Sequence, residues 1–294
     1  MQVQSPCENL PMIKYSTKTL SNGLKVIVHE DPTTPLVTVN ILYKVGARDE
    51  TPEKTGFAHL FEHLMFGGSI NIPEYDSPLQ LAGGDNNAFT NNDITNYYLT
   101  LPAENIETGF WLESDRMLSL AFSEKSLEVQ RSVVIEEFKQ RYLNQPYGDV
   151  WLLLRPLAYK VHPYQWATIG KEISHIENAT LEDVKDFFFR FYCPDNAIMT
   201  VAGGVKAEEV FALAEKWFGE IQRKRKDFTP YPKEPRQEEY RELTVHRDIP
   251  FDSVYRAYHC CARLDEEFYA VDLLTDILSR GRSSRLYNAL VKEQ

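Results

Sequence analysis

The chain has 294 residues, of which 43% are hydrophobic and 12% aromatic, so it is long enough to fold as a globular protein with a large buried core. Its formal net charge is -11, and the acidic residues are spread along the chain instead of forming a tail. This charge disfavours nucleic acid and anionic membrane surfaces as partners, and no apolar run reaches the roughly 18 residues that a membrane span needs.

The N-terminal region and the cysteines bear on the compartment. The first 20 residues lack a basic start followed by an apolar stretch, so no signal peptide is visible and we predict a cytoplasmic location. The cysteines show neither the spacing of a zinc ribbon nor the pattern of a disulfide framework. They are Cys7, Cys193, Cys260 and Cys261.

Strands are expected in the first third of the chain. Residues 24–31 and 36–45 alternate apolar and polar side chains and are rich in β-branched residues, which is typical of half-buried strands. We expect these two strands to pair with each other. Residues 86–102 continue the alternation with threonine, tyrosine and isoleucine, which indicates further extended structure.

The segment GFAHLFEHLMFGG, residues 56–68, places two histidines and a glutamate in an otherwise apolar stretch. If this segment is helical, His59 and His63 share one face with their Cβ atoms about 5 to 6 Å apart, so both imidazoles can reach one ion. Glu62 borders the same face, where a carboxylate can take a proton from a water that the metal acidifies. Unligated, these side chains would be costly to bury among apolar neighbours. We therefore interpret them as a zinc site, the alternative being a helix with satisfied core histidines.

Four later segments repeat apolar residues at intervals of three and four, as amphipathic helices do. They are residues 104–118, 123–143, 180–192 and 206–221. Ser123 and Thr180 are the expected N-caps of two of them, and residues 196–205 are expected to form a strand. The order of strands, helices and a returning strand predicts an α+β layered domain with a mostly antiparallel sheet covered by helices.

A catalytic zinc site needs a third protein ligand, which is expected to be an acid on another helix. Residues 123–143 offer Glu128, Glu136 and Glu137. Val133 belongs to the apolar stripes of both Glu136 and Glu137, so periodicity leaves the choice between those two open.

The last quarter of the chain changes in composition. Residues 223–245 are rich in charge and proline, which predicts an extended linker, and the basic cluster at 223–226 is interpreted as a solvated hinge. A strand at 253–263 and a helix at 265–281 then repeat the order of residues 39–68 without the histidines and glutamate. We therefore predict three parts: a catalytic domain at 1–222, the linker at 223–245, and the truncated start of a second homologous domain, lacking the metal motif, at 246–294.

Several motifs in order resemble the pitrilysin/insulinase family of zinc peptidases, which includes the mitochondrial processing peptidase and bacterial processing-peptidase-like members. GFAHLFEHLMFGG holds the inverted zinc motif H-x-x-E-H, and RSVVIEEFKQ follows it further along the chain. Residues 82–102 and 162–205 and the segment GRSSRLY also match. The resemblance therefore covers most of residues 18–294.

The resemblance implies one zinc ion per chain, bound by His59, His63 and Glu137, with Glu62 as the general base. It thereby selects Glu137 over Glu136 as the third ligand. Many family members carry a glutamate seven residues before that ligand. This chain has Gln130 there, whose amide is expected to hydrogen-bond the ligand without supplying a charge.

The family also implies how substrate is held. Asn87, Ala88, Phe89 and Thr90 correspond to an edge strand to which an extended peptide or unfolded polypeptide adds through main-chain hydrogen bonds. Family proteins close two homologous halves around the substrate, so a homodimer or a partner subunit is expected to close the cleft here. No nucleic acid and no membrane span are expected.

The function expected from the sequence is that of a zinc-dependent metalloendopeptidase acting on oligopeptides or extended polypeptide segments. The alternative is a noncatalytic peptide-binding or assembly subunit of the same family. Metal content and the effect of replacing Glu62 distinguish the two.

Overall fold

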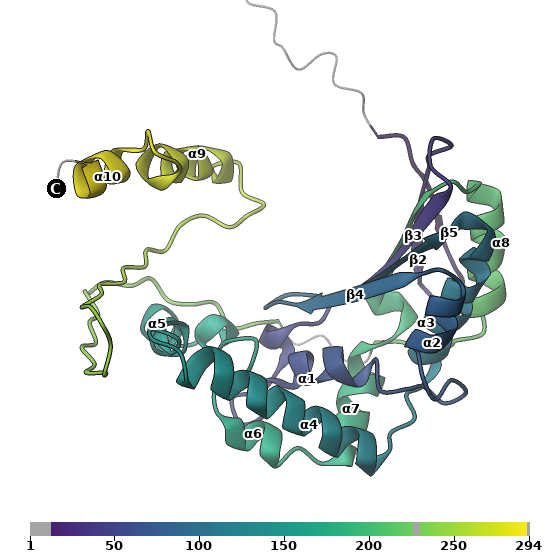
Figure 1. The fold of residues 1–294 in the computed structure, drawn as a ribbon, viewed down its shortest axis with the longest axis horizontal. Coiled ribbons are helices and arrows are strands. Elements are labelled where there is room, and N and C mark those ends of the chain that lie inside the picture. Colours follow the sequence, from purple (N-terminus) through teal and green to yellow (C-terminus); the bar gives the residue numbers. More distant parts are fainter. Residues whose placement is uncertain (1–12, 226–229, 293–294) are drawn as a thin grey trace, which may run out of the picture. The chain divides into compact units, whose positions relative to one another are not determined.

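The computed structural model describes residues 13–225 and 230–292, which divide into two compact units at Pro250 and Phe251 (Figure 1). Cys7 and Lys226 lie outside the described residues. The first unit contains a six-stranded sheet in the order β1-β2-β6-β3-β5-β4. Its strands are β1 (Ser16–Thr19), β2 (Lys25–Glu30), β3 (Leu36–Tyr43), β4 (Asp85–Thr90), β5 (Thr95–Pro102) and β6 (Ala197–Gly203). Only the pairing of β2 with β6 is parallel, so the mostly antiparallel sheet is confirmed.

The expected pairing of β2 with β3 is wrong, because β6 lies between them. The loop from β2 to β3 crosses the end of β6, where Asp31 N–H donates to the Gly203 carbonyl oxygen at 2.8 Å and Gly204 N–H donates to the Leu36 carbonyl oxygen at 2.9 Å. A Cβ on Gly203 would lie 2.2 Å from that Leu36 oxygen. The loop can pass this close only because glycine has no side chain. Alternation within β2 and β3 does not reveal that a distant strand enters between them.

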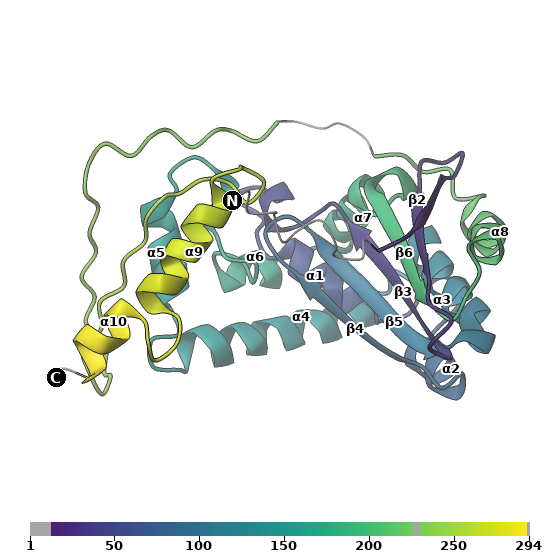
Figure 2. The same cartoon turned by 90° about the horizontal axis from the view of Figure 1, so that it is seen from above.

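The helices of the first unit gather on one face of the sheet (Figure 2). They are α1 (Phe57–Leu64), α2 (Asp76–Leu81), α3 (Ile106–Leu118), α4 (Glu124–Phe138), α5 (Val150–Ala158), α6 (Ile173–Glu177), α7 (Leu181–Phe191) and α8 (Ala207–Phe218). On that face Val39, Leu99 and Val201 are completely buried, while alternate residues on the other face keep partial exposure. α1 lies between the sheet and α4, and this arrangement positions the metal motif (Figures 1 and 2).

The expected helices are confirmed as α3, α4, α7 and α8, with a change from α- to π-helix at Lys139–Leu143 after α4. The two expected N-caps are present. Ser123 Oγ accepts a hydrogen bond from Ser126 N–H, and Thr180 forms a capping box with Asp183.

Residues 223–225, expected to be part of a solvated hinge, are packed on the first unit instead. The Arg223 guanidinium donates to the Tyr192 carbonyl oxygen at 2.7 Å and lies over the ring of Phe188. Arg225 donates to Asn196 Oδ1 at 3.0 Å. In an extended chain alternate side chains point to opposite sides, so both arginines face the protein and the residue between them faces solvent.

In the second unit the helix expected at 265–281 is confirmed as α9 (Phe268–Ser279), which is followed by α10 (Arg285–Tyr287). The strand expected at 253–263 is not formed, since these residues pair with no strand in the described part of the chain. Alternating side chains favour a strand, but a strand exists only where another offers its hydrogen-bonding groups. None of the described helices combines the length and the apolar character needed to cross a membrane.

Candidate metal centre

α1 carries the metal motif on the face that is turned away from the core. Its buried residues are Phe57, Ala58, Leu60, Phe61 and Leu64, whereas His59, Glu62 and His63 keep partial exposure. The apolar face fixes the helix against the sheet, because aromatic rings of α7 and of the following turn stack on Phe61. The three polar side chains are therefore held on a rigid element and remain free to act together.

The start of α1 is fixed by Glu50 and Gly56. The Glu50 carboxylate accepts hydrogen bonds from Gly56 N–H at 2.9 Å and Ala58 N–H at 2.8 Å, and so satisfies donors that the helix leaves unpaired. Burial raises the pKa of Glu50 to about 8, although these two hydrogen bonds oppose the shift. Gly56 has a φ of 88°, and a Cβ there would lie 2.7 Å from the Ile169 carbonyl oxygen, so the position requires glycine. Sequence reasoning missed Glu50, which stands in a polar stretch without periodicity.

His59 and His63 of α1 and Glu137 of α4 converge on one point. Glu137 Oε2 lies 3.6 Å from His59 Nε2 and 3.5 Å from His63 Nε2, and the three ligand atoms all lie within 4.8 Å of one another. Tetrahedral ligands about 2.0 to 2.1 Å from a zinc ion are roughly 3.3 Å apart. The spacing therefore fits a single ion.

The protonation states of His59 and Glu137 also suit a metal. Burial lowers the pKa of His59 to about 4, so its imidazole is neutral at pH 7 and keeps a free lone pair. The hydrogen bond from His63 lowers the pKa of Glu137, which is therefore ionised. Neutral imidazole nitrogens with one carboxylate oxygen are a donor set that zinc prefers.

Glu137, and not Glu136, faces α1. Val134 lies one turn before Glu137 and is completely buried. The Glu136 side chain is 61% exposed and pairs with Lys139 at 2.7 Å. Val133 is 44% exposed, and this apolar residue on the solvent side is the reason that periodicity did not separate the two acids.

Glu62 lies beside the ligands and toward β4. Burial raises the pKa of Glu62, opposed by the Thr90 hydroxyl and the charge of His63. A carboxylate with a raised pKa is a stronger base when it is ionised, which suits the acceptance of a proton. No ligand role is needed for Glu62, because the converging group is complete without it.

The residues expected to bind substrate form most of β4. This strand pairs with β5 in a register that sets Ala88 opposite Tyr97, and within the described residues no strand lies on its other side. Phe89 is 45% exposed. Ala88 N–H donates to Asn87 Oδ1 at 2.8 Å. The structure thus brings Asn87, Ala88, Phe89 and Thr90 to an edge of the sheet, with Thr90 beside Glu62.

The expected hydrogen bond between Gln130 and the third ligand is not formed. Gln130 lies seven residues before Glu137 on α4, which corresponds to about 10.5 Å of helix, and its side chain has no hydrogen bond in the described part of the chain. Arg141 approaches the ligand instead, with Nη1 3.0 Å from Glu137 Oε1. Sequence reasoning missed Arg141, although its position four residues after the ligand was an available signal.

The turn that joins β4 to β5 is anchored from outside the hairpin. Asp93 in this turn accepts hydrogen bonds from Arg48 Nη1 at 2.7 Å and from the Tyr164 hydroxyl at 2.6 Å. Tyr164 belongs to the aromatic loop after α5, in the 3-10 turn Pro163–Gln165. This loop therefore helps to fix the end of β4 that lies near Glu62.

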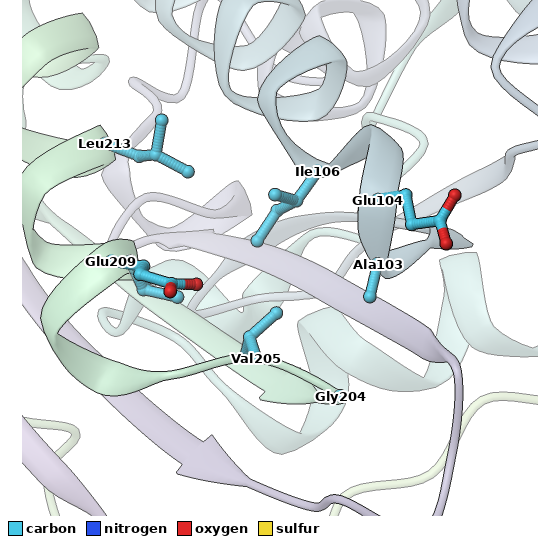
Figure 3. A pocket seen from close by; sticks show the side chains of 8 residues that line it. Ala103, Glu104, Ile106, Gly204, Val205, Glu209 and Leu213 are labelled. Atoms are coloured by element: carbon cyan, nitrogen blue, oxygen red, sulfur yellow. The ribbon is translucent and has the colours of Figure 1, made fainter.

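A cavity of about 240 Å³ lies elsewhere, between the starts of α3 and α8 (Figure 3). Its lining residues are Ala103, Glu104, Ile106, Gly204, Val205, Glu209, Val210 and Leu213. It adjoins the C-terminal end of β5, whereas the metal centre adjoins the turn at the start of that strand. The cavity contains no residue of the metal centre and is not part of it.

An H-x-x-E-H helix whose histidines meet a glutamate from a neighbouring helix, beside the edge of a mostly antiparallel sheet, defines the class of inverted-motif zinc peptidase domains. The chain belongs to the insulinase family, peptidase family M16. Residues 25–159 match the model described as "Insulinase (Peptidase family M16)", and residues 178–294 match the model described as "Peptidase M16 inactive domain".

Individual relatives agree with this assignment. The chain is 37% identical to the zinc protease PqqE of Helicobacter pylori, over 96% of this chain and 64% of that protein. It is 30% identical to the mitochondrial-processing peptidase subunit beta of Saccharomyces cerevisiae, over 70% of this chain and 44% of that protein. A crystal structure of a protease from Helicobacter pylori superposes with a TM-score of 0.87 at 34% identity, covering 96% of this chain and 69% of that chain.

Two conclusions follow from these comparisons. The chain spans less than two thirds of the length of these two curated relatives. Zinc is the cofactor that the site fits, one ion per chain, since relatives are named zinc proteases and the His59, His63 and Glu137 group can hold one metal ion. The cytoplasmic location stays a prediction.

Proposed function

We propose that this chain is the catalytic half of a zinc-dependent metalloendopeptidase that hydrolyses oligopeptides or extended polypeptide segments. The proposal depends on the convergence of His59, His63 and Glu137 on one point. Glu62 lies beside them as a partly buried carboxylate that is not needed as a metal ligand. A zinc ion held by these three ligands would supply Lewis acidity to the scissile carbonyl group and to a water. Glu62 takes the proton of that water and delivers it to the leaving amine.

The free edge of β4 binds the substrate backbone in this proposal. An extended peptide adds there through main-chain hydrogen bonds, with little demand on its side chains. The substrate-binding residues are Asn87, Ala88, Phe89 and Thr90. Their place on the edge strand and the contact of Thr90 with Glu62 support this role. A folded substrate cannot present such a strand, so peptides and unfolded segments are preferred.

The other parts of the enzyme are proposed on the same basis. Residues 1–222 form the catalytic domain, residues 223–245 the linker, and residues 246–294 the start of a second homologous domain. A complete second domain, a second copy of the chain or a partner subunit closes the cleft. The name of the yeast relative, a subunit beta, supports the last of these.

The replacement Glu62→Gln tests the proposal. The amide keeps the shape of the side chain but cannot accept a proton, so we expect stoichiometric zinc with peptide cleavage lowered by about 10² to 10⁴. Zinc is measured by metal analysis and cleavage with a mixed peptide library, with and without chelator. Glu136→Gln, next to the third ligand but exposed, is the control and retains both properties. Full turnover by the Glu62→Gln variant rejects the assignment.

A second candidate is a noncatalytic peptide-binding or assembly subunit. The match of residues 178–294 to an inactive-domain model favours it. The four residues of the candidate centre lie within the other matched segment, residues 25–159. A freshly purified protein without stoichiometric zinc and without cleavage supports this alternative.

A further inference from the structure

The carboxylate of Glu137 has different partners on its two oxygens. Oε2 faces His59 Nε2 and His63 Nε2 at 3.6 and 3.5 Å, while Oε1 faces Arg141 Nη1 at 3.0 Å. The Glu137 side chain is only 18% exposed, so water has limited access to it. The oxygen turned away from the metal position is therefore held by one specific guanidinium.

The backbone of Arg141 reaches this place by a local change in helix type. α4 ends at Phe138 and continues as one π-helical turn, Lys139–Leu143, which is closed by a hydrogen bond from Asn144 N–H to the Lys139 carbonyl oxygen at 2.8 Å. π-Helical turns are rare in proteins, and many of those that occur lie at functional sites. The Arg141 side chain is 69% exposed, so its pair with Glu137 adds little to the stability of the fold.

We propose that Arg141 is a positioning residue that fixes Glu137 as a one-oxygen metal ligand. The inference rests on the proposed metal site and adds a residue to it. A carboxylate that is free to turn can offer both oxygens to a metal ion and fill the position that a water needs. With Oε1 held by Arg141, only Oε2 is available, so the fourth position stays open.

The sequence predicts that Gln130 hydrogen-bonds the third ligand. In the structure Arg141 contacts that ligand instead, and unlike an amide it supplies a positive charge. The site contains two carboxylates, Glu62 and Glu137, and Arg141 is the cation that pairs with the second of them in the described residues. Outer partners of metal ligands commonly change metal affinity by 10- to 100-fold when they are removed.

The test compares Arg141→Gln, Arg141→Lys and the control Lys139→Gln in the full chain. Lys139 also pairs with a glutamate on this helix, Glu136 at 2.7 Å, but that glutamate faces solvent. Zinc affinity is measured by competition with a chromogenic chelator, and ligand number by the visible spectrum of the Co²⁺-substituted protein. We expect Arg141→Gln to weaken zinc binding by about 10- to 100-fold. Its Co²⁺ spectrum should shift toward the weaker absorption of higher coordination.

The other variants complete the comparison. Arg141→Lys keeps a cation and should recover most of the affinity, while Lys139→Gln should match the wild type. Zinc affinity and Co²⁺ spectrum unchanged in Arg141→Gln overturn the inference. A rise in KM alone also overturns it, because Arg141 would then be a substrate-binding group. If the wild-type chain binds no zinc, the proposed function is overturned as well. If the wild type cleaves peptides and the zinc affinity of Arg141→Gln equals that of the wild type, only this inference is overturned.

Discussion

Glu50 shows how one residue links protonation to the position of the metal-binding helix. It is 8% exposed, and both of its oxygens accept backbone hydrogen bonds at the start of α1. Because burial raises its pKa from 4.5 to about 8, the folded state holds the proton more tightly than the unfolded state. The contribution of Glu50 to stability is therefore fully present below about pH 4.5 and is lost as the pH rises through about 8.

The variant Glu50→Gln tests this dependence. It cannot ionise, so between pH 5 and pH 8 the free energy of unfolding of the wild type should fall relative to that of the variant, by on the order of 3 to 5 kcal/mol at most. Chemical denaturation at several pH values measures the difference. Glu53→Gln, an exposed neighbour, should give a curve parallel to the wild type. A parallel curve for Glu50→Gln would mean that Glu50 is already ionised in the fold.

At the residue scale the sequence predicts ligand types better than it predicts their supporting partners. His59 and His63 follow from helical spacing together with the cost of burying unligated histidines, and the structure brings them together with Glu137. The choice of Glu137 needed the family resemblance, since Val133 is exposed. Glu50 acts through tertiary contacts of an ordinary charged residue, which no local pattern marks. Arg141 lies four residues after Glu137 on the same helical stretch, so its contact could have been predicted from that spacing.

At the scale of elements, β4 depends on contacts that hold the turn beyond it. Ala47 N–H and Arg48 N–H donate to the carbonyl oxygens of Asn91 and Asn92, and Asp93 is held by Arg48 and Tyr164. An edge strand has a partner on one side only, so its order depends on such anchors. The aromatic loop after α5 therefore anchors the turn between β4 and β5, a role that its sequence did not reveal.

We predict that Tyr164→Phe weakens peptide binding without removing zinc. The variant loses one hydrogen bond to a carboxylate, worth about 1 kcal/mol, so KM should rise by about fivefold with a smaller change in kcat. Steady-state cleavage of an extended peptide and hydrogen exchange of the β4 amides measure the effect. Tyr98→Phe removes a hydroxyl from the adjacent strand that has no hydrogen bond in the described residues, and it serves as the control. Equal kinetics of the two variants would show that the turn needs no such anchor.

The elements themselves were predicted well where one face of a helix is buried, as in α3, α7 and α8. The strands other than β1 were also predicted to exist, but strand order was not predicted, because the entry of β6 between β2 and β3 is a long-range event. The strand expected at 253–263 failed for a related reason. Its partner would have to come from elsewhere, and propensity carries no information about that partner.

At the scale of the whole molecule, the segment that leads to the second unit is bound to the first along much of its length. Residues 230–250 contain no helix or strand, but the Glu234 carboxylate accepts hydrogen bonds from three consecutive backbone N–H groups, Lys160, Val161 and His162, at 2.8, 2.8 and 2.9 Å. Arg247 pairs with Asp149 at 2.8 Å at the other end of α5. Charge and proline content predicted an extended linker, and the same charges turn out to attach it.

The contacts of Glu234 hold this segment on the first unit, and the replacement Glu234→Ala tests their importance. The replacement leaves three backbone donors to water and should free residues 230–245, with a loss of about 1 to 2 kcal/mol because the site is near the surface. Limited proteolysis should then cut this segment several-fold faster than in the wild type, while zinc content stays the same. Glu238→Ala, in the same segment but exposed, should leave the rate unchanged. If both variants are cut at the wild-type rate, the other contacts hold the segment without Glu234, and the path of the linker is fixed by its arginines.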